Sequence, residues 1–333
     1  MTQPGPSVDA SPSVTGRQDG TPLPVLAEVV RSGFVESVHT GSVVAIDPEG
    51  HVLISLGRPD EPCYPRSSNK PLQAVAMVRA GLDIPDDLLA LASASHAGED
   101  MHVDGVRRML ATVGLDETAL QCPEDLPGDD ETRMRMIRSG AAADRIHMNC
   151  SGKHAAMLTT CVLNGWPVET YLEPEHPLQV HVRDVVEELA GEKVAHIGVD
   201  GCGAPLFAFS LKGLARAYQA IITAEPGTAE RGVADAFRAY PEMTSGTKRP
   251  EARLMRGIAG SLNKGGAEAV DAVALSDGTA LAVKIADGGQ RARVPVTVAT
   301  LAALGQVAPV PGKLNGEDSG GYQLISRITC SKR

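Results

Sequence analysis

The chain has 333 residues and a formal net charge of −10, with 43% hydrophobic and 22% charged residues. This length suffices for one large domain or two modest ones with a buried core, and the composition is that of an ordinary globular protein. The negative balance gives no basic surface for nucleic acid or anionic lipid, which excludes both as expected partners. No apolar run approaches the roughly 20 residues that a membrane span needs.

The first 24 residues are rich in Pro, Ser, Thr and Gly and lack the basic start and apolar stretch of a secretory signal. We therefore expect residues 1–24 to form a disordered tail on a cytoplasmic protein. The cysteines do not have the spacing of a disulfide framework, which indicates reduced thiols. They are Cys63, Cys122, Cys150, Cys161, Cys202 and Cys330.

Two hairpins are predicted, one near each end of the chain. Val43–Ile46 and Val52–Leu56 are β-branched runs joined by a turn-forming Asp-Pro-Glu-Gly tetrapeptide. Val270–Leu275 and Thr279–Ile285 flank an Asp-Gly dipeptide, which is typical of type I′ turns.

Between the hairpins, five segments have apolar residues at helical spacing. They are Leu72–Arg79, Val103–Ala111, His154–Leu163, Leu178–Leu189 and Leu211–Ile222. Strands, then many helices, then strands predict an α/β (α+β) fold, in which a mostly antiparallel sheet from both ends of the chain is flanked by helices. We expect a single domain with a helical subdomain over residues 25–311 and a poorly ordered surface segment over residues 312–333.

The first candidate for chemistry is Tyr64–Gln73, which places Ser67 and Lys70 three residues apart where a helix begins. Pro71 suits the first helical turn, so Ser67 is predicted near the N-cap. A serine becomes a strong nucleophile when a base removes its proton, and a lysine can be that base if burial or a nearby cation lowers its pKa. The same spacing also fits an exposed cap followed by a solvated lysine.

A second candidate is Ser93–Glu99, a group of small polar residues that follows an apolar run. Ser95 offers a second hydroxyl, which could relay protons to a leaving group or attack the substrate itself. The alternative interpretation of this segment is a capped helix or the start of a loop.

Two further segments carry cysteines. In the first, Cys150, Lys153 and His154 share one face of the opening turn of a predicted helix. In the second, Val199–Pro205, a strand ends in a glycine-rich loop that contains Cys202. The two loops could meet around a substrate or a metal, but neither cysteine belongs to a Cys-x-x-Cys motif, so spacing alone favours buried free thiols.

Four stretches occur in one order with one approximate spacing, namely Arg66–Pro71, Ser95-His96, Asn149–His154 and Asp200–Gly203. Together with Pro241–Met243 and Lys284–Gly288 they resemble the L-asparaginase II family of rhizobial type, from about Val25 to about Pro311. The resemblance implies a catalytic domain with a fold similar to serine β-lactamases and glutaminases. It also implies hydrolysis of L-asparagine to L-aspartate and ammonia.

The resemblance assigns roles by position. Ser67 and Lys70 match the first serine–lysine pair of the family, and Ser95 with Lys284 match the second. Lys264 competes for the last place, and Lys284 is preferred because it lies on the predicted hairpin strand. We predict that Ser67 attacks the amide after losing its proton through Lys70 and Lys284, while Ser95 relays protons, although either serine could attack first.

The resemblance further implies a substrate site, a zinc ion and a homodimer. The implied substrate-binding residues are Arg66, His96, Cys150, His154, Asp200 and Gly201. The implied zinc ligands are Cys150, Lys153 and Cys202, of which the lysine must be neutral to coordinate. Asp200 is expected to accept a hydrogen bond from the substrate ammonium.

Two segments depart from the family's pattern. Thr244–Ala252 lacks the aspartate–threonine pair that is expected after its arginine, and the segment from Lys313 differs from the usual ending. Three alternatives stay open: glutamine as the substrate, a β-lactam as the substrate, or a noncatalytic amide-binding sensor that has kept the pocket. Fold similarity alone cannot choose between them.

Overall fold

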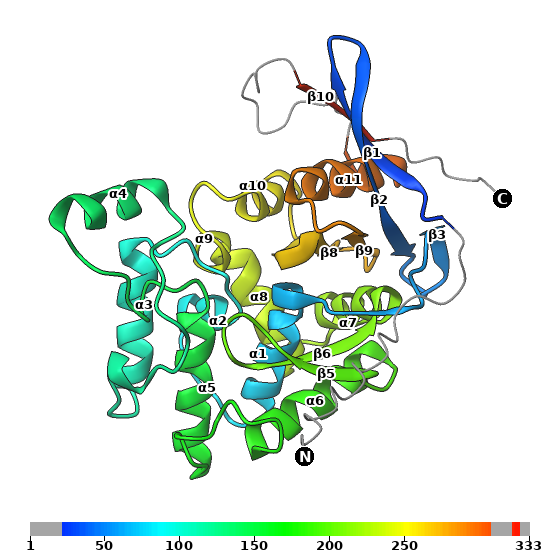
Figure 1. Ribbon diagram of the computed structural model, residues 1–333. Coiled ribbons are helices and arrows are strands. Elements are labelled where there is room, and N and C mark those ends of the chain that lie inside the picture. Colours follow the sequence, from blue (N-terminus) through cyan, green and yellow to red (C-terminus); the bar gives the residue numbers. More distant parts are fainter. Residues whose placement is uncertain (1–21, 308–321, 327–333) are drawn as a thin grey trace, which may run out of the picture.

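A seven-stranded antiparallel sheet forms one half of the protein in this computed structural model, which describes residues 22–307 and the strand at 322–326 (Figure 1). The strand order is β10-β1-β2-β9-β8-β7, and β3 also pairs with β2. The sheet combines strands from both ends of the chain, as predicted. Its strands are β1 (Val25–Arg31), β2 (Phe34–Ile46), β3 (Val52–Leu56), β7 (Leu262–Gly266), β8 (Val270–Ala274), β9 (Ala280–Ile285) and β10 (Tyr322–Ser326).

Both predicted hairpins are confirmed, since β2 pairs with β3 and β8 pairs with β9. The β8–β9 turn is not of type I′, because Gly278 has a positive φ of 95° but Asp277 does not. Instead, the Gly278 amide donates to the Leu275 carbonyl at 2.9 Å. The result is a longer loop closed by a left-handed glycine, a common alternative for hairpins.

Helices make up the other half and also cover the far face of the sheet (Figure 1). They are α1 (Lys70–Arg79), α2 (Asp86–Ala92), α3 (Asp100–Ala111), α4 (Asp130–Ser139), α5 (Ser151–Asn164), α6 (Pro177–Ala190), α7 (Leu211–Thr223), α8 (Ala229–Ala239), α9 (Pro241–Thr244), α10 (Pro250–Gly257) and α11 (Gln290–Ala303). A small sheet joins β4 (Pro62–Cys63), β6 (Pro205–Ser210) and β5 (His196–Val199). The five predicted helices correspond to α1, α3, α5, α6 and α7, and the predicted fold class is confirmed.

The pleat of the sheet divides the apolar residues between two cores. On β2, Val44 and Ile46 pack into the large core of the helical half, while Val43 and Ala45 pack into a smaller core beneath α11. Successive residues of a strand point to opposite faces, so burial on both faces makes the end of this strand, Val43–Ile46, continuously apolar.

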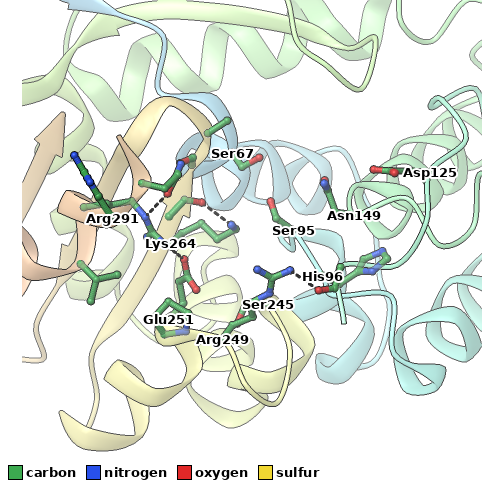
Figure 2. A pocket seen from close by; sticks show the side chains of 18 of the residues that line it. Ser67, Ser95, His96, Asp125, Asn149, Ser245, Arg249, Glu251, Lys264 and Arg291 are labelled. Carbon is green, nitrogen blue, oxygen red and sulfur yellow. Dashed lines mark hydrogen bonds and ion pairs between the residues drawn. The ribbon is translucent and has the colours of Figure 1, made fainter. Parts of the chain in front are cut away.

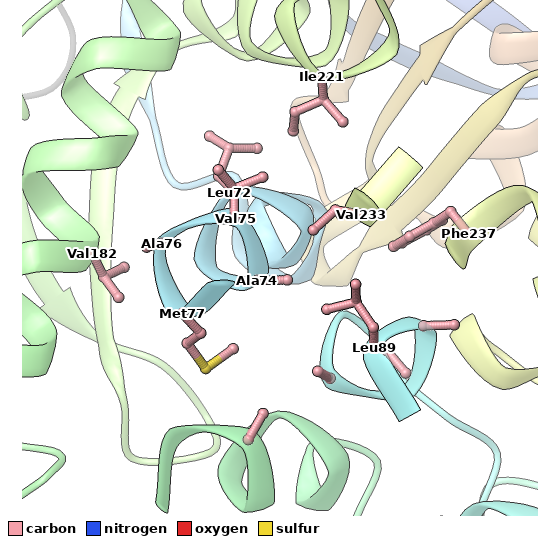
Figure 3. Packing of buried hydrophobic residues seen from close by; sticks show 14 of the residues in the cluster. Leu72, Ala74, Val75, Ala76, Met77, Leu89, Val182, Ile221, Val233 and Phe237 are labelled. Carbon is pink, nitrogen blue, oxygen red and sulfur yellow. The ribbon is translucent and has the colours of Figure 1, made fainter. Parts of the chain in front are cut away.

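Helix α1 runs through the middle of the large core (Figure 3). Its residues from Lys70 to Met77 are all buried, and Figure 3 shows Val182, Ile221 and Leu89 from three other helices around it. A helix that is apolar on every side is a buried one. The rigid setting of α1 fixes the position of the segment that carries Ser67 and Lys70.

The expected N-terminal tail lies almost wholly outside the described residues, which begin at 22. Within the segment 312–333, which we expected to be poorly ordered, the structure describes strand β10, paired with β1. The sequence did not predict this strand. Residues 308–321 and 327–333 lie outside the described residues. Among the helices that the structure describes, none combines the length and apolar character of a membrane span.

Candidate active site

Ser67 lies in a strained turn ahead of α1. The turn is a 3-10 helix, η1 (Arg66–Asn69), and the N-cap residue of α1 is Asn69, so Ser67 precedes the cap instead of forming it. Arg66 has a left-handed backbone with φ of 52°, a conformation that costs free energy in a residue other than glycine. The Arg66 guanidinium donates to Asp200 at 2.8 Å, which ties this turn to the loop after β5.

Strand β7 passes directly beside this turn. A side chain on Gly266 would place its Cβ 2.7 Å from the Pro65 carbonyl oxygen and 3.2 Å from the Ser67 amide nitrogen. Only glycine permits so close an approach, and it marks where the strand reaches the site. Lys264, two residues earlier on β7, is thereby brought to the same place.

Lys70 makes its contacts to the second serine. Its Nζ donates to the Ser95 hydroxyl at 2.9 Å, the Cys150 sulfur at 3.0 Å and the Ala94 carbonyl at 2.5 Å. Within the described part of the chain it forms no hydrogen bond with the Ser67 hydroxyl. Ser67 and Lys70 are close in the sequence, but the serine that the Lys70 amine contacts in the folded protein is Ser95.

A cavity of about 640 Å³ lies between the end of β7 and the helical half (Figure 2). Ser67, Ser95, His96 and Lys264 all line it. Further polar residues of its wall are Asp125, Arg133, Asn149, Ser245, Arg249, Glu251, Gln290, Arg291 and Arg293. Two hydroxyls and a lysine from three separate segments thus share one pocket, as enzyme sites commonly do.

The structure puts Lys264, and not Lys284, in this pocket. The strand predicted to carry Lys284 is present as β9, but the Lys284 Nζ donates to the carbonyls of Glu268 and Ile285, and the residue does not line the cavity. The predicted strand is thus present, but Lys264 lines the cavity and Lys284 does not. β8 separates β9 from β7 in the sheet, and β7 is the strand that adjoins Ser67.

The pKa of Lys264 is lowered from 10.5 to about 7. Burial is the main cause, because removal from water disfavours the charged form, and the nearby Lys70 cation adds to it. The Glu251 carboxylate opposes the shift. An amine with this pKa is largely neutral near pH 8 and can accept a proton, as a general base must.

A buried ion-pair network packs against β7 next to Lys264. Arg293 on α11 donates to Glu251 on α10 at 2.7 Å and lies 3.2 Å from the Asp271 carboxylate on β8. A Cβ on Gly265 would lie 2.5 Å from Glu251 and closer still to Arg293, so the ion pair rests on the bare backbone of β7. The network fixes the strand next to Lys264 and satisfies charges that would be costly to bury alone.

His96 is held as a neutral imidazole at the inner wall of the pocket. Its Nδ1 accepts from the Gly98 amide at 3.1 Å, which leaves Nε2 to donate to the Ser151 hydroxyl at 2.9 Å. Burial, with a stacked His102 at 5.0 Å, keeps its pKa well below the ordinary value. Both nitrogens are engaged, so His96 is a rigid wall residue of the pocket.

The two cysteine loops meet next to the pocket. Lys153 donates to the Cys202 sulfur at 3.1 Å, and a hydrogen bond from Cys150, with Lys153 and His154 nearby, lowers the pKa of the Cys202 thiol. His154 Nδ1 and the Tyr171 hydroxyl share a hydrogen bond of 2.7 Å. The buried Nε2 of His154 has no hydrogen-bond partner in the described structure. Two sulfurs, an amine and an imidazole are therefore gathered in one buried place.

The other predicted substrate-binding residues are not part of the pocket lining. Arg66, Cys150, His154, Asp200 and Gly201 do not line the cavity. Asp200 accepts from the Arg66 side chain and from the Gly201 amide, both at 2.8 Å. Its carboxylate is thus already engaged within the protein.

Sequence reasoning missed most of the pocket wall contributed by the α9–α10 turn, α10 and α11. Ser245, Arg249 and Glu251 belong to the segment noted only as a departure from the family's pattern, and Arg293 carried no recognisable motif. The departure was itself a signal, because Glu251 supplies a carboxylate near the place where an aspartate is expected.

The sequence matches the family model of L-asparaginase II over residues 27–316, which is most of the chain. The match defines the class of protein as an asparaginase-type amidohydrolase. The chain belongs to the L-asparaginase II family, as its motifs predict. No curated protein matches it.

The comparison with solved structures finds similar chains at low identity. A β-lactamase from Mycobacterium bovis has a TM-score of 0.46 and 17% identity, covering 85% of this chain and 96% of that one. The protein Mglu in its native form has a TM-score of 0.43 and 13% identity, covering 79% and 64%. EstCE1, a hydrolase with promiscuous acyltransferase activity, has a TM-score of 0.38 and 12% identity, covering 82% and 91%. At these scores the likenesses support no statement about activity.

Proposed function

We propose that the protein hydrolyses the side-chain amide of L-asparagine to L-aspartate and ammonia through a serine nucleophile activated by lysine. The observation that carries the proposal is the meeting of Ser67, Ser95 and the buried Lys264 in one pocket of a member of the L-asparaginase II family. A serine beside a neutral amine is the arrangement that such chemistry needs.

In the proposed reaction Ser67 attacks the amide carbon and its hydroxyl proton passes to the neutral amine of Lys264. As the carbon–nitrogen bond breaks, the departing nitrogen takes up the proton that Lys264 accepted, delivered through Ser95, which Lys70 holds at 2.9 Å, so ammonia leaves and Lys264 is neutral again. Water then attacks the resulting ester and gives a proton to the Lys264 amine. This proton returns to the Ser67 oxygen as the ester bond breaks and L-aspartate is released. The backbone amide of Ser67, beside Gly266, is the kind of donor that stabilises the oxyanion.

We also propose that Cys150, Lys153 and Cys202 hold a zinc ion. Two sulfurs, one with a lowered thiol pKa, and a nitrogen ligand are donors that zinc prefers. Lys153 would release its proton on binding. Zinc bound there would join the two cysteine loops and orient the substrate.

The first experiment is ammonia release from L-asparagine on the purified protein near pH 8, with L-glutamine and a chromogenic β-lactam alongside. Release from asparagine alone supports the proposal, and release from glutamine or β-lactam opening supports the corresponding rival. Stabilisation by asparagine without ammonia would support a noncatalytic sensor. Ser67→Ala should abolish turnover, while Ser93→Ala, which removes a buried serine that donates to Leu89, serves as the matched control.

Assembly as a homodimer and a cytoplasmic location belong to the same proposal. Light scattering of the purified protein at micromolar concentration would give twice the mass of the 333-residue chain for a dimer. A mass equal to one chain would contradict the homodimer.

A further inference from the structure

The turn between α9 and α10 is fixed against the segment that carries Ser95. The Ser95 amide donates to the Thr244 carbonyl at 3.1 Å. Thr247 then donates twice to Glu99, from its amide and its hydroxyl, each at 2.9 Å. These bonds lie on either side of Ser245, so Ser245 is held rigidly close to Ser95.

Ser245 presents a hydroxyl to the pocket that nothing in the described protein satisfies. The residue is only 2% exposed and lines the cavity, and its Oγ has no hydrogen-bond partner among the described residues. A buried hydroxyl without a partner is unfavourable, and such groups are rare unless a bound molecule completes them. A ligand atom in the pocket would be that partner.

Arg249 lies on the same turn and lines the same pocket. Its Nη2 donates to the Gly128 carbonyl at 3.2 Å, and its stem packs on Gly246, where a Cβ would lie 3.3 Å from Arg249 Cγ. Figure 2 shows Ser245 and Arg249 between Ser95 and Glu251. Since a guanidinium has five N–H donors, this single bond leaves most of them available.

The acidic groups that contact this turn are bound to residues other than Arg249. Glu99 accepts from Thr247, and Lys248 forms ion pairs with Asp129 at 3.2 Å and Glu131 at 3.6 Å. Arg249 has no carboxylate partner within the described part of the chain. Lys248 is therefore neutralised at the surface, whereas the next residue, Arg249, faces the pocket.

The pocket as a whole is positively charged, although the chain carries a net charge of −10. Its wall contains four arginines, Arg133, Arg249, Arg291 and Arg293, but only two acids, Asp125 and Glu251. Arg293 is compensated by Glu251 and Asp271. The remaining arginines attract an anion, and the field of a cleft concentrates ligands of the opposite sign.

We propose that Ser245 and Arg249 recognise a carboxylate at the end of the substrate remote from the scissile amide, so that the enzyme selects carboxylate-bearing amides. The hydroxyl donates one hydrogen bond to the carboxylate and the guanidinium donates one or two more, which is the geometry that such pairs prefer. For L-asparagine this group is the α-carboxylate. The inference rests on the proposed amidohydrolase function for the nature of the ligand.

The test compares ligands that differ only in this carboxylate. Calorimetry measures the binding of L-aspartate and of β-alanine, which lacks the α-carboxylate, to the intact protein and to Arg249→Gln, Ser245→Ala and the control Lys248→Gln. We expect aspartate affinity to fall about 10- to 100-fold in Arg249→Gln and several-fold in Ser245→Ala. Lys248→Gln should leave it unchanged, and β-alanine should bind all four proteins equally weakly.

Kinetics then separate recognition from a structural role of the turn. With L-asparagine, Arg249→Gln should raise KM far more than it lowers kcat, whereas turnover of 3-aminopropanamide, which lacks the carboxylate, should not change. Equal losses for both substrates, or aspartate binding no tighter than β-alanine, would overturn the proposal. Failure of the proposed function is a different result, namely no ammonia from any amide while aspartate binding still depends on Arg249.

Discussion

Replacing Lys264 by methionine tests the proposed base and the electrostatic cost of burying it. With a pKa of about 7, roughly 90% of Lys264 is neutral at pH 8, whereas an ordinary lysine with a pKa of 10.5 would be roughly 0.3% neutral. A positioned general base contributes about 10²- to 10⁴-fold to the rate. We therefore expect Lys264→Met to lower kcat for asparagine at least about 100-fold.

The same substitution should stabilise the protein. Because the folded-state pKa lies below the unfolded value, the unfolded chain binds more protons between pH 7 and 10.5, and wild-type stability rises with pH across that window. The penalty is complete below pH 7, where it amounts to at most about 5 kcal/mol for a shift of this size. Lys264→Met removes the penalty, so its gain in unfolding free energy should be largest near pH 6 and shrink toward pH 10.5.

Lys284→Met is the matched control, because Lys284 belongs to the next strand but one and does not line the pocket. Ammonia release from asparagine and urea denaturation at pH 6, 8 and 10 would be measured on both variants. Near-normal turnover in a folded Lys264→Met, together with a large loss in Lys284→Met, would refute the reasoning and restore the assignment made from the sequence.

Three further predictions concern the surroundings of Lys264 and the cysteine loops. Glu251→Gln leaves Arg293 without its 2.7 Å partner and should cost about 3 kcal/mol in urea denaturation; an unchanged midpoint would show that Asp271 alone compensates Arg293. Gly265→Ala places a methyl group against Arg293 and Glu251 and should cost about 1–3 kcal/mol; a stable, fully active variant would contradict the close approach. Zinc at about 100 times its dissociation constant should raise the unfolding free energy of the wild-type protein by about 2.7 kcal/mol. The same gain is expected in the control Cys161→Ala but not in Cys202→Ala. Equal responses in all three proteins would exclude the proposed ligand set.

Much of the fold could be predicted because its signals are local. The helices α1, α5 and α7 show apolar periodicity within their own sequences, and the hairpin strands alternate or run apolar between turn residues. Helix α4 was missed because only two of its side chains, Thr132 and Met136, are buried, so it has almost no apolar face to detect. Strand β10 was missed because its pairing with β1 depends on a partner roughly 290 residues away.

The site was less predictable, because its residues come from segments that approach each other only in the folded chain. The motifs pointed to Ser67, Ser95 and His96, and all three line the pocket. The spacing of Ser67 and Lys70, however, says nothing about Lys70 reaching Ser95, because the contact crosses between η1–α1 and the loop after α2.

The choice between Lys264 and Lys284 could have been made from the residues that follow each lysine. Both lie on strands, so secondary structure alone could not separate them. Lys284 is followed by a large apolar residue, Ile285, whereas Lys264 is followed by two glycines within the strand. Glycines inside a strand weaken it and persist where another backbone or a charged group must come close. Here one glycine accommodates the Glu251–Arg293 ion pair and the other the backbone before Ser67, so the glycine pair marked the strand that reaches the site.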